Sequence, residues 1–178
     1  MLKRKSLREL MESGDGLAGF KWPEGTQDFG IAIRRDGTWI HRGDPIRRAK
    51  LVQLFATILQ RDEAGDFWLV TPVEKGRIEV EDAPFVAVEM RVVGSGPADR
   101  RLEFRTNLGY WVAAGPGHAI RVEIDPDSDE PSPYIHVRDG LDALIARAVF
   151  YDLVELAEER DGVLVVTSGG EEFVLGRI

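Results

Sequence analysis

The sequence predicts an α+β fold in which one strand–helix–strand unit is built twice. Three observations lead to this class. Candidate strands come in runs and do not alternate regularly with helices, which is typical of antiparallel sheets. Two helices are predicted, one in each half of the 178-residue chain, from helical patterns of apolar residues. The residues around these two segments are similar in kind and order, which indicates a duplication.

The repeat is clearest in the helical segments. Residues 46–55 match residues 145–154, and the matched pairs are Ile46/Ile145, Arg48/Arg147, Ala49/Ala148, Leu51/Phe150 and Leu54/Leu153. An aromatic-Ile-His strand precedes each segment, and a strand that ends in Val-Thr follows each. We therefore expect mostly antiparallel sheets, each covered by one helix. Two related halves create a seam, and clefts between domains are favoured places for ligands.

The first half is predicted to begin with a hairpin. Residues 13–27 are rich in glycine and read as a loop. The alternating run 29–33 leads into Asp36-Gly37, a strong hairpin-turn signal, and Trp39 to His41 pairs back. Asp44-Pro45 is expected to open a helix, because Asp caps helix starts and Pro is tolerated at the first helical position. The buried stripe of that helix is predicted to be Leu51, Leu54, Phe55, Ile58 and Leu59.

The second half is predicted to be mostly strand until a second helix. The first half is expected to end with strands at residues 66–71 and 77–81. In the second half, strands are expected at residues 85–93, 101–106, 110–114, 119–124 and 133–137. A helix capped by Asp139 should run from about 141 to 159, followed by a closing hairpin around Gly169-Gly170. We expect a tail and loop at 1–27, a first repeat domain at 28–84 and a second repeat domain at 85–178.

Composition limits the classes of function. The chain contains no cysteine, so disulfides, thiolate metal sites and cysteine nucleophiles are excluded. Its formal net charge of −8 disfavours long nucleic acids, whereas basic residues gather between 34 and 50, which favours small anions. No signal peptide and no bilayer-spanning run is evident, so a cytoplasmic protein without membrane contact is expected. Both nucleotide-binding glycine motifs are missing, and we expect no cofactor.

Arg48 and Arg147 are the first candidates for chemistry, because both lie in the apolar helical pattern. An arginine on a packed helix needs a partner. One interpretation is a bidentate grip on a phosphate or carboxylate at the seam. The other is an intramolecular ion pair with an acid such as Asp82 or Glu74.

Two further groups could supply polar contacts. The run from Thr71 to Lys75 follows a strand end, where binding residues are common, although it also fits a surface turn with a weak ion pair between Glu74 and Lys75. Asn107 precedes Gly109 in a tight turn, so its amide serves either the turn itself or recognition of a ligand.

Carboxylates suggest a third class of function. Glu79, Glu81 and Asp82 are closely spaced, and paired carboxylates can perform acid–base work or hold Mg²⁺. A solvated strand edge is the commoner meaning. His41 and His136 occupy matched places in the repeat, and neither has the Ser and Asp partners of a catalytic triad.

Several motifs taken together resemble a known family. They are Asp36-Gly-x-Trp39, Pro45-Ile-x-Arg48, Leu51-Val-x-Leu-Phe55, Leu69-Val-Thr-Pro-Val-Glu-Lys75, Val80-Glu-Asp-Ala-Pro-Phe85, Thr106-Asn107 and Leu144-Ile-Ala-Arg-x-Val-Phe-Tyr-Asp-Leu-Val154. The chain resembles bacterial domain-of-unknown-function family 1285 from about Asp28 to the C-terminus. That family often has a second acid shortly after Asp28, where this chain has Gly30.

The resemblance implies a duplicated α+β fold whose second half is superficially similar to a pleckstrin-homology-type domain. It also implies a nucleotide-like ligand between the halves and a role in signalling, without an established enzymatic activity. The leading hypothesis is therefore a small-anion-binding module that uses Arg48, Arg147, Lys75, Thr71, Asn107 and Glu74. A protein-interaction module is the alternative, and a metal-assisted enzyme that uses Glu74, Glu81 and Asp82 is the third hypothesis.

Overall fold

A computed structural model describes residues 27–72 and 74–178, in which there are two helices and fifteen strands. The first unit contains β1 (Gln27–Ile33), β2 (Trp39–His41), β3 (Asp44–Pro45), α2 (Ala49–Thr57), β4 (Leu59–Arg61), β5 (Phe67–Val70) and β6 (Lys75–Val80). The second unit contains β7 (Phe85–Val93), β8 (Arg101–Thr106), β9 (Trp111–Ala113), β10 (Ile120–Ile124), β11 (Pro131–Arg138), β12 (Leu141–Ile145), α3 (Arg147–Glu155), β13 (Glu158–Arg160), β14 (Val163–Ser168) and β15 (Glu171–Arg177).

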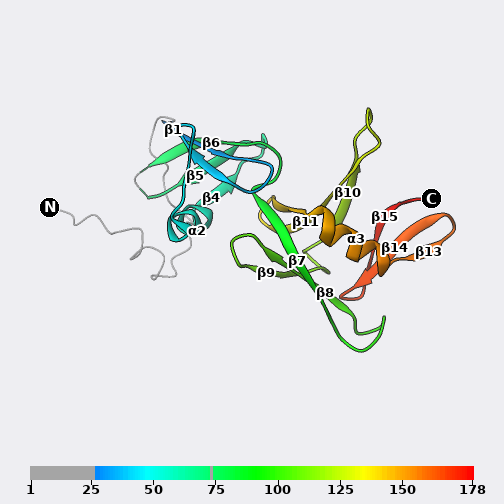
Figure 1. The fold of residues 1–178 in the computed structure, drawn as a ribbon. Helices are drawn as coiled ribbons and strands as arrows, with labels where there is room; N and C mark the ends of the chain where they lie inside the picture. Colours follow the sequence, from blue (N-terminus) through cyan, green and yellow to red (C-terminus); the bar gives the residue numbers. More distant parts are fainter. Residues whose placement is uncertain (1–26, 73) are drawn as a thin grey trace.

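Three sheets organise these strands (Figure 1). The first unit forms a six-stranded sheet in the order β3-β2-β1-β6-β5-β4. The second unit forms a six-stranded sheet in the order β10-β11-β12-β7-β8-β9 and a three-stranded sheet, β13-β14-β15. Every pairing is antiparallel except those of β1 with β6 and of β12 with β7, so the sheets are mostly antiparallel, as predicted.

The order of elements confirms the duplication. In both units a three-stranded meander is followed by a helix and then by a second meander: β1-β2-β3-α2-β4-β5-β6 and β10-β11-β12-α3-β13-β14-β15. The first and last strands of each set lie together, as β1 with β6 and β10 with β15. Even a local pairing recurs, because His41 lies opposite Asp44 and His136 lies opposite Asp142. Among the described residues of the first unit, nothing corresponds to the meander β7-β8-β9.

The first helix begins later than predicted. Asp44 and Pro45 form the edge strand β3, and α2 starts at Ala49 without a side-chain cap on Arg48. The fully buried positions of the helix are Val52 and Ala56, one residue away from two positions of the predicted stripe. Asp44 pairs with His41 in the sheet, so its backbone is extended and it does not cap the helix.

The second helix is shorter than predicted at both ends. Residues 141–145 form β12, in which Leu141, Ala143 and Ile145 are buried and the residues between them are not. The sequence prediction assigned Leu141 and Ile145 to the apolar face of the helix, although residues 141–145 alternate with the period of a strand. The helix itself covers 147–155, and β13 follows it. Each helix is therefore about nine residues long.

One hydrophobic core joins the two units. Its buried members come from α2 and the first sheet as well as from β7, β8, β11, β12 and α3. Trp39 stacks on Phe55 at 6.2 Å between ring centroids, under α2. In the second unit the buried Ser168 hydroxyl accepts from Leu102 N–H and donates to Ala114 O, which ties β14 to β8 and to the end of β9. No helix in the described residues is long and apolar enough to cross a membrane.

Gly30 sits in a bulge of β1. Its φ is +62°, in the left-handed region, and the register between β1 and β6 shifts between Asp28 and Ala32. Asp28 Oδ1 accepts the Gly30 N–H at 2.8 Å and closes the bulge. Glycine therefore suits this backbone better than a second acid would.

Candidate functional site

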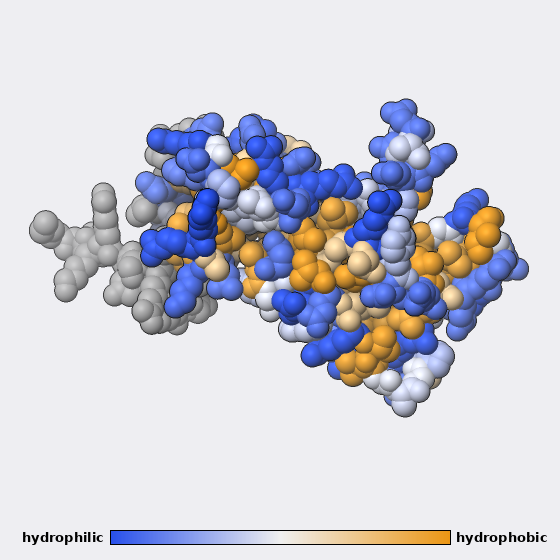
Figure 2. Space-filling model, viewed as in Figure 1, coloured by the Kyte–Doolittle hydropathy of each residue, from blue (hydrophilic) through white to orange (hydrophobic). Residues whose placement is uncertain are grey.

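A cavity of about 600 Å³ lies between the two units. We call it the seam cavity. The β1–β2 turn lines it from the first unit, and β11, the end of β12 and the start of α3 line it from the second. Its lining residues are Arg35, Asp36, Glu130, Pro131, Pro133, Leu144, Ile145, Ala146, Arg147, Phe150 and Tyr151. Figure 2 shows apolar surface around α3 with hydrophilic residues beside it.

Arg147 is the sequence-predicted residue that lines this cavity. It is the first residue of α3, and no side chain caps the helix start. No hydrogen bond or ion pair joins its exposed guanidinium to another residue in the described ranges. The predicted alternative, an ion pair with Asp82 or Glu74, is therefore wrong for Arg147. An unpaired cation beside uncapped helical N–H groups is suited to an anion.

Arg35 supplies a second cation, but this one is held by neighbours. Its Nη1 lies 3.3 Å from Asp82 Oδ2, and its Nη2 donates to Ser132 Oγ at 3.2 Å. Its backbone N–H donates to Glu81 Oε2 at 3.0 Å. Arg35 thus bridges the β1–β2 turn, the segment between the units and β11, and it fixes one wall of the seam cavity.

The remaining lining sets the character of a ligand. Asp36 and Glu130 balance the two arginines, so the cavity carries little net charge. Hydrogen bonding from Thr38 N–H lowers the pKa of Asp36, which keeps its carboxylate ionised. An apolar wall is formed by Phe150, half-buried Leu144 and Tyr151, which is 57% exposed. The arrangement fits a small molecule with one anionic group and an apolar body.

Arg48 occupies the matched place in the first unit but lies elsewhere. It is the N-cap residue of α2, it is exposed, and it does not line the seam cavity. Like Arg147, it forms no ion pair within the ranges that the structure describes. The structure therefore does not bring the two predicted arginines into one groove.

Thr71, Glu74 and Lys75 come together in a turn of the first unit. Thr71 Oγ1 accepts the Glu74 N–H at 2.9 Å and donates to Glu74 O at 3.2 Å. The Lys75 ammonium lies 4.2 Å from the ring centroid of Trp68. None of these three residues lines the seam cavity, and the hydroxyl and the ammonium already have partners.

Asn107 holds backbone together at the junction of the units. Its Oδ1 accepts from Val86 N–H at 3.0 Å, and its own N–H donates to Val86 O at 2.7 Å. Its Nδ2 donates to Gly37 O at 3.4 Å across the seam. A Cβ on Gly37 would lie 2.5 Å from that nitrogen, so the close approach requires glycine. The geometry gives Asn107 a structural part.

Two of the predicted carboxylates, Glu81 and Asp82, contact residues at the seam. Asp82 Oδ1 accepts the Tyr134 hydroxyl at 2.7 Å. Burial, and then the hydrogen bond to Asp82, raise the pKa of Tyr134 to about 12. Asp82 also lines a small polar cavity of about 200 Å³ together with Arg121 and Asp142. Within the described ranges, no three His, Asp or Glu side chains converge in a way that could hold a metal ion.

The two matched histidines differ in their surroundings. His136 Nδ1 lies 2.9 Å from Asp142 Oδ1, and Asp142 also pairs with Arg121 at 2.8 Å. His41 is exposed on β2, and its strand partner is Asp44. Neither of them lines the seam cavity.

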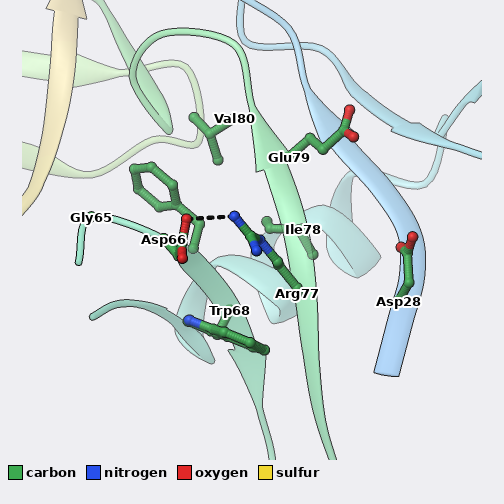
Figure 3. A pocket seen from close by; sticks show the side chains of 9 residues that line it. Asp28, Gly65, Asp66, Trp68, Arg77, Ile78, Glu79 and Val80 are labelled. Carbon is green, nitrogen blue, oxygen red and sulfur yellow. Dashed lines mark hydrogen bonds and ion pairs between the residues drawn. The ribbon is translucent and has the colours of Figure 1, made fainter. Parts of the chain in front are cut away.

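A groove of about 590 Å³ on the first unit is less suited to an anion (Figure 3). Arg77 is the cation that lines it, and its guanidinium is paired with Asp66 at 2.6 Å. Asp28 and Glu79 line it as well, which adds two more carboxylates. Negative charge therefore prevails there.

Sequence reasoning missed Arg35 and Tyr151 as cavity residues. Arg35 was visible only as one member of the basic stretch between residues 34 and 50, and Tyr151 only as part of a helical pattern. Arg35 reaches β11 through its hydrogen bond to Ser132, and Tyr151 lies on α3, which follows β12, so both line one cavity. Such long-range pairing has no local signal in the sequence.

Comparison with known proteins identifies the family. Two family models match the chain: the N-terminal domain of unknown function DUF1285 over residues 20–83, and the C-terminal domain of the protein of unknown function DUF1285 over residues 84–175. No curated protein matches significantly.

Two solved structures are similar to this chain. A DUF1285 family protein from Silicibacter pomeroyi DSS-3 is 43% identical, with a TM-score of 0.81, over 98% of this chain and 97% of that one. A DUF1285 family protein from Shewanella baltica OS155 is 29% identical, with a TM-score of 0.54, over 71% of this chain and 91% of that one. The chain therefore belongs to the DUF1285 family.

Proposed function

We propose that this protein is a ligand-binding module that holds a small anionic molecule, nucleotide-like in size and chemistry, in the seam cavity. The observation that carries the proposal is the unpaired guanidinium of Arg147 at an uncapped helix start inside a cavity between the units. Arginine recognises phosphate and carboxylate bidentately, and helical N–H groups add to that recognition. Phe150 and the exposed ring of Tyr151 would face the apolar body of the ligand.

The seam position gives such a ligand a way to report its presence. Because both units line the cavity, a ligand that fits one arrangement of the units better than another would shift the balance between them. We therefore propose a signalling role in the cytoplasm. The similarity of the second half to a pleckstrin-homology-type domain, which the family resemblance implies, stays a prediction.

Thermal unfolding with ATP, GTP and inorganic phosphate tests binding. A nucleotide present at 100 times its dissociation constant should add about 2.7 kcal/mol to the free energy of unfolding. Arg147→Gln should remove most of this gain. Arg48→Gln is the matched control, because it changes the equivalent residue of the repeat outside the cavity, and it should leave the gain intact. Absence of any gain, or equal loss in both variants, would contradict the proposal.

A protein-interaction role is the second candidate, and exposed apolar side chains on the last strand favour it. Val174 in β15 is 55% exposed and Ile178, just after this strand, is 74% exposed. The double variant Val174→Thr, Ile178→Ser should abolish capture of a partner by the immobilised protein while leaving nucleotide-induced stabilisation unchanged. If the double variant still captures the partner, the exposed side chains of β15 and Ile178 do not support a protein-interaction role.

A further inference from the structure

A cavity of about 520 Å³ lies where the end of α2 meets the second sheet. We call it the aromatic pocket. Its lining residues are Thr57, Phe85, Tyr110, Trp111, Val112, Ala113, His118, Val137 and Arg138. It shares no lining residue with the seam cavity, so what it binds is independent of the function proposed above.

Aromatic rings form one wall of the pocket. Tyr110 and Trp111 are large aromatic residues, and each is 39% exposed. Phe85 meets Tyr110 edge-to-face, with ring centroids 6.4 Å apart and an interplanar angle of 84°. The Arg91 guanidinium lies 4.0 Å from the centroid of Trp111. These contacts hold both rings in place, and preordered aromatic surface favours a planar ligand.

His118 supplies a hydrogen-bond acceptor. Its Nδ1 lies 3.0 Å from the carbonyl oxygen of His136, which accepts only, so Nδ1 carries the proton. In a neutral imidazole Nε2 is then an acceptor. No other hydrogen bond of this ring occurs within the described ranges.

Arg138 supplies a fixed cation. Its Nη2 donates to Ala56 O at 2.7 Å and its Nη1 to Leu59 O at 3.5 Å, at the carboxyl end of α2. The negative end of the helix dipole stabilises a guanidinium at this place. These two bonds leave other N–H groups of the guanidinium, which presents five in all, without a partner among the described residues.

We infer that the aromatic pocket binds an aromatic carboxylate that also carries a ring amine or hydroxyl. The ring would lie against Tyr110, the carboxylate would meet Arg138, and the ring N–H or O–H would donate to His118 Nε2. Each of these three features corresponds to one group of the pocket. A saturated ring or a missing donor should therefore weaken binding.

Saturation-transfer NMR with 4-aminobenzoate on the full chain tests the inference. Benzoate, which lacks the donor, and cyclohexanecarboxylate, which lacks the flat ring, are the matched probes. We expect saturable binding of 4-aminobenzoate that is about tenfold tighter than binding of either matched probe. Equal binding of the three probes, or no saturable signal from 4-aminobenzoate, would overturn the inference.

Variants locate the site. Tyr110→Leu keeps an apolar side chain but removes the aromatic ring, and His118→Asn keeps a donor for His136 O but removes Nε2. Each should weaken binding of 4-aminobenzoate by about tenfold. Tyr151→Leu changes an exposed aromatic of the seam cavity and should have no effect on this probe. Weakening by Tyr151→Leu but not by the two pocket variants would refute the assignment. Circular dichroism melts of all three variants confirm that each is folded.

Discussion

The hydroxyl of Tyr134 links the two units at the level of a single residue. It donates to Asp82 from a side chain that is almost entirely buried. The Arg121 guanidinium lies 4.2 Å from its ring centroid. Burial raises the pKa of the phenol to about 12, and the Asp82 carboxylate acts in the same direction. The folded protein therefore holds this proton more tightly than the unfolded chain, whose tyrosines titrate near 10.

The raised pKa of Tyr134 predicts that the protein loses stability at alkaline pH. Between pH 10 and about 12 the unfolded chain has lost the proton and the folded protein keeps it, so the free energy of unfolding falls as the pH rises. Tyr134→Phe should be less stable than the natural protein at pH 8, and the gap should narrow by about 2 kcal/mol by pH 12. Urea unfolding at several pH values measures it. A constant gap from pH 8 to 12 would show that the phenol is not the linked group.

At the scale of elements, the contact between β1 and β6 depends on one glycine. A Cβ on Gly76 would lie 2.1 Å from the ring of Phe29, which packs over the strand. The parallel pairing of these strands places residues 27 and 76 side by side. Gly176 occupies the last strand of the second repeat, and a Cβ there would meet nothing within 4 Å.

Two alanine substitutions should therefore have opposite outcomes. Gly76→Ala should destabilise the protein by about 1–3 kcal/mol, because the added methyl group displaces the Phe29 ring. Gly176→Ala should be neutral or stabilise by up to about 1 kcal/mol, because it restricts the unfolded chain. Chemical denaturation of both variants compares them. Equal effects would mean that strand entropy, and not the Phe29 contact, decides the cost.

At the scale of the whole molecule, side chains from each unit bind groups of the other. Arg35 donates to Ser132 Oγ, Arg138 donates to Ala56 O at the end of α2, and Asn107 donates to Gly37 O. Together with the shared core they define the position of one unit against the other. The walls of the seam cavity therefore depend on them.

A double-mutant cycle measures the ion pair with Asp82 that holds Arg35 at the seam. Arg35→Gln and Asp82→Asn should each destabilise the protein, and the double variant should lose less than their sum by about 1 kcal/mol, a modest coupling because Arg35 is 57% exposed. Asparagine keeps an oxygen for Tyr134, so the cycle isolates the charge. The same cycle on Arg77 and Asp66, an ion pair away from the seam, is the control. Hydrogen exchange at the Ala83 amide is a second measurement, and only the variants of Arg35 and Asp82 should speed it up. Strict additivity would contradict the link.

The sequence predicted the duplication well because it rests on local residue patterns. The hairpin turn at Asp36-Gly37 formed as expected, with Gly37 at a φ of +88°. Most strands fell within two residues of their predicted ends. The helix starts were wrong where backbone pairing competed with capping: Asp44 pairs with His41, and residues 141–145 pair with both β11 and β7.

The candidate site was predicted only in part. Arg147 was identified from its place in the repeat. The second arginine that lines the cavity is Arg35 and not Arg48. Asn107 was identified from its turn, but its amide is used to hold Val86 and Gly37. Residue type indicated which side chains are chemically able to bind. Their freedom to bind depends on neighbours that are distant in sequence.

The sequence by itself determined the family, the repeated order of elements and the alternation that divides each strand into a core face and an outer face, because all three are written in neighbouring residues. The tertiary structure alone decided that β12 pairs in parallel with β7, that β15 lies against β10, and that the first unit meets the second beside α3. These pairings bring together residues about a hundred positions apart, such as Arg35 and Ser132. Their energies come from burial and hydrogen bonding between segments whose local patterns are equally compatible with other partners.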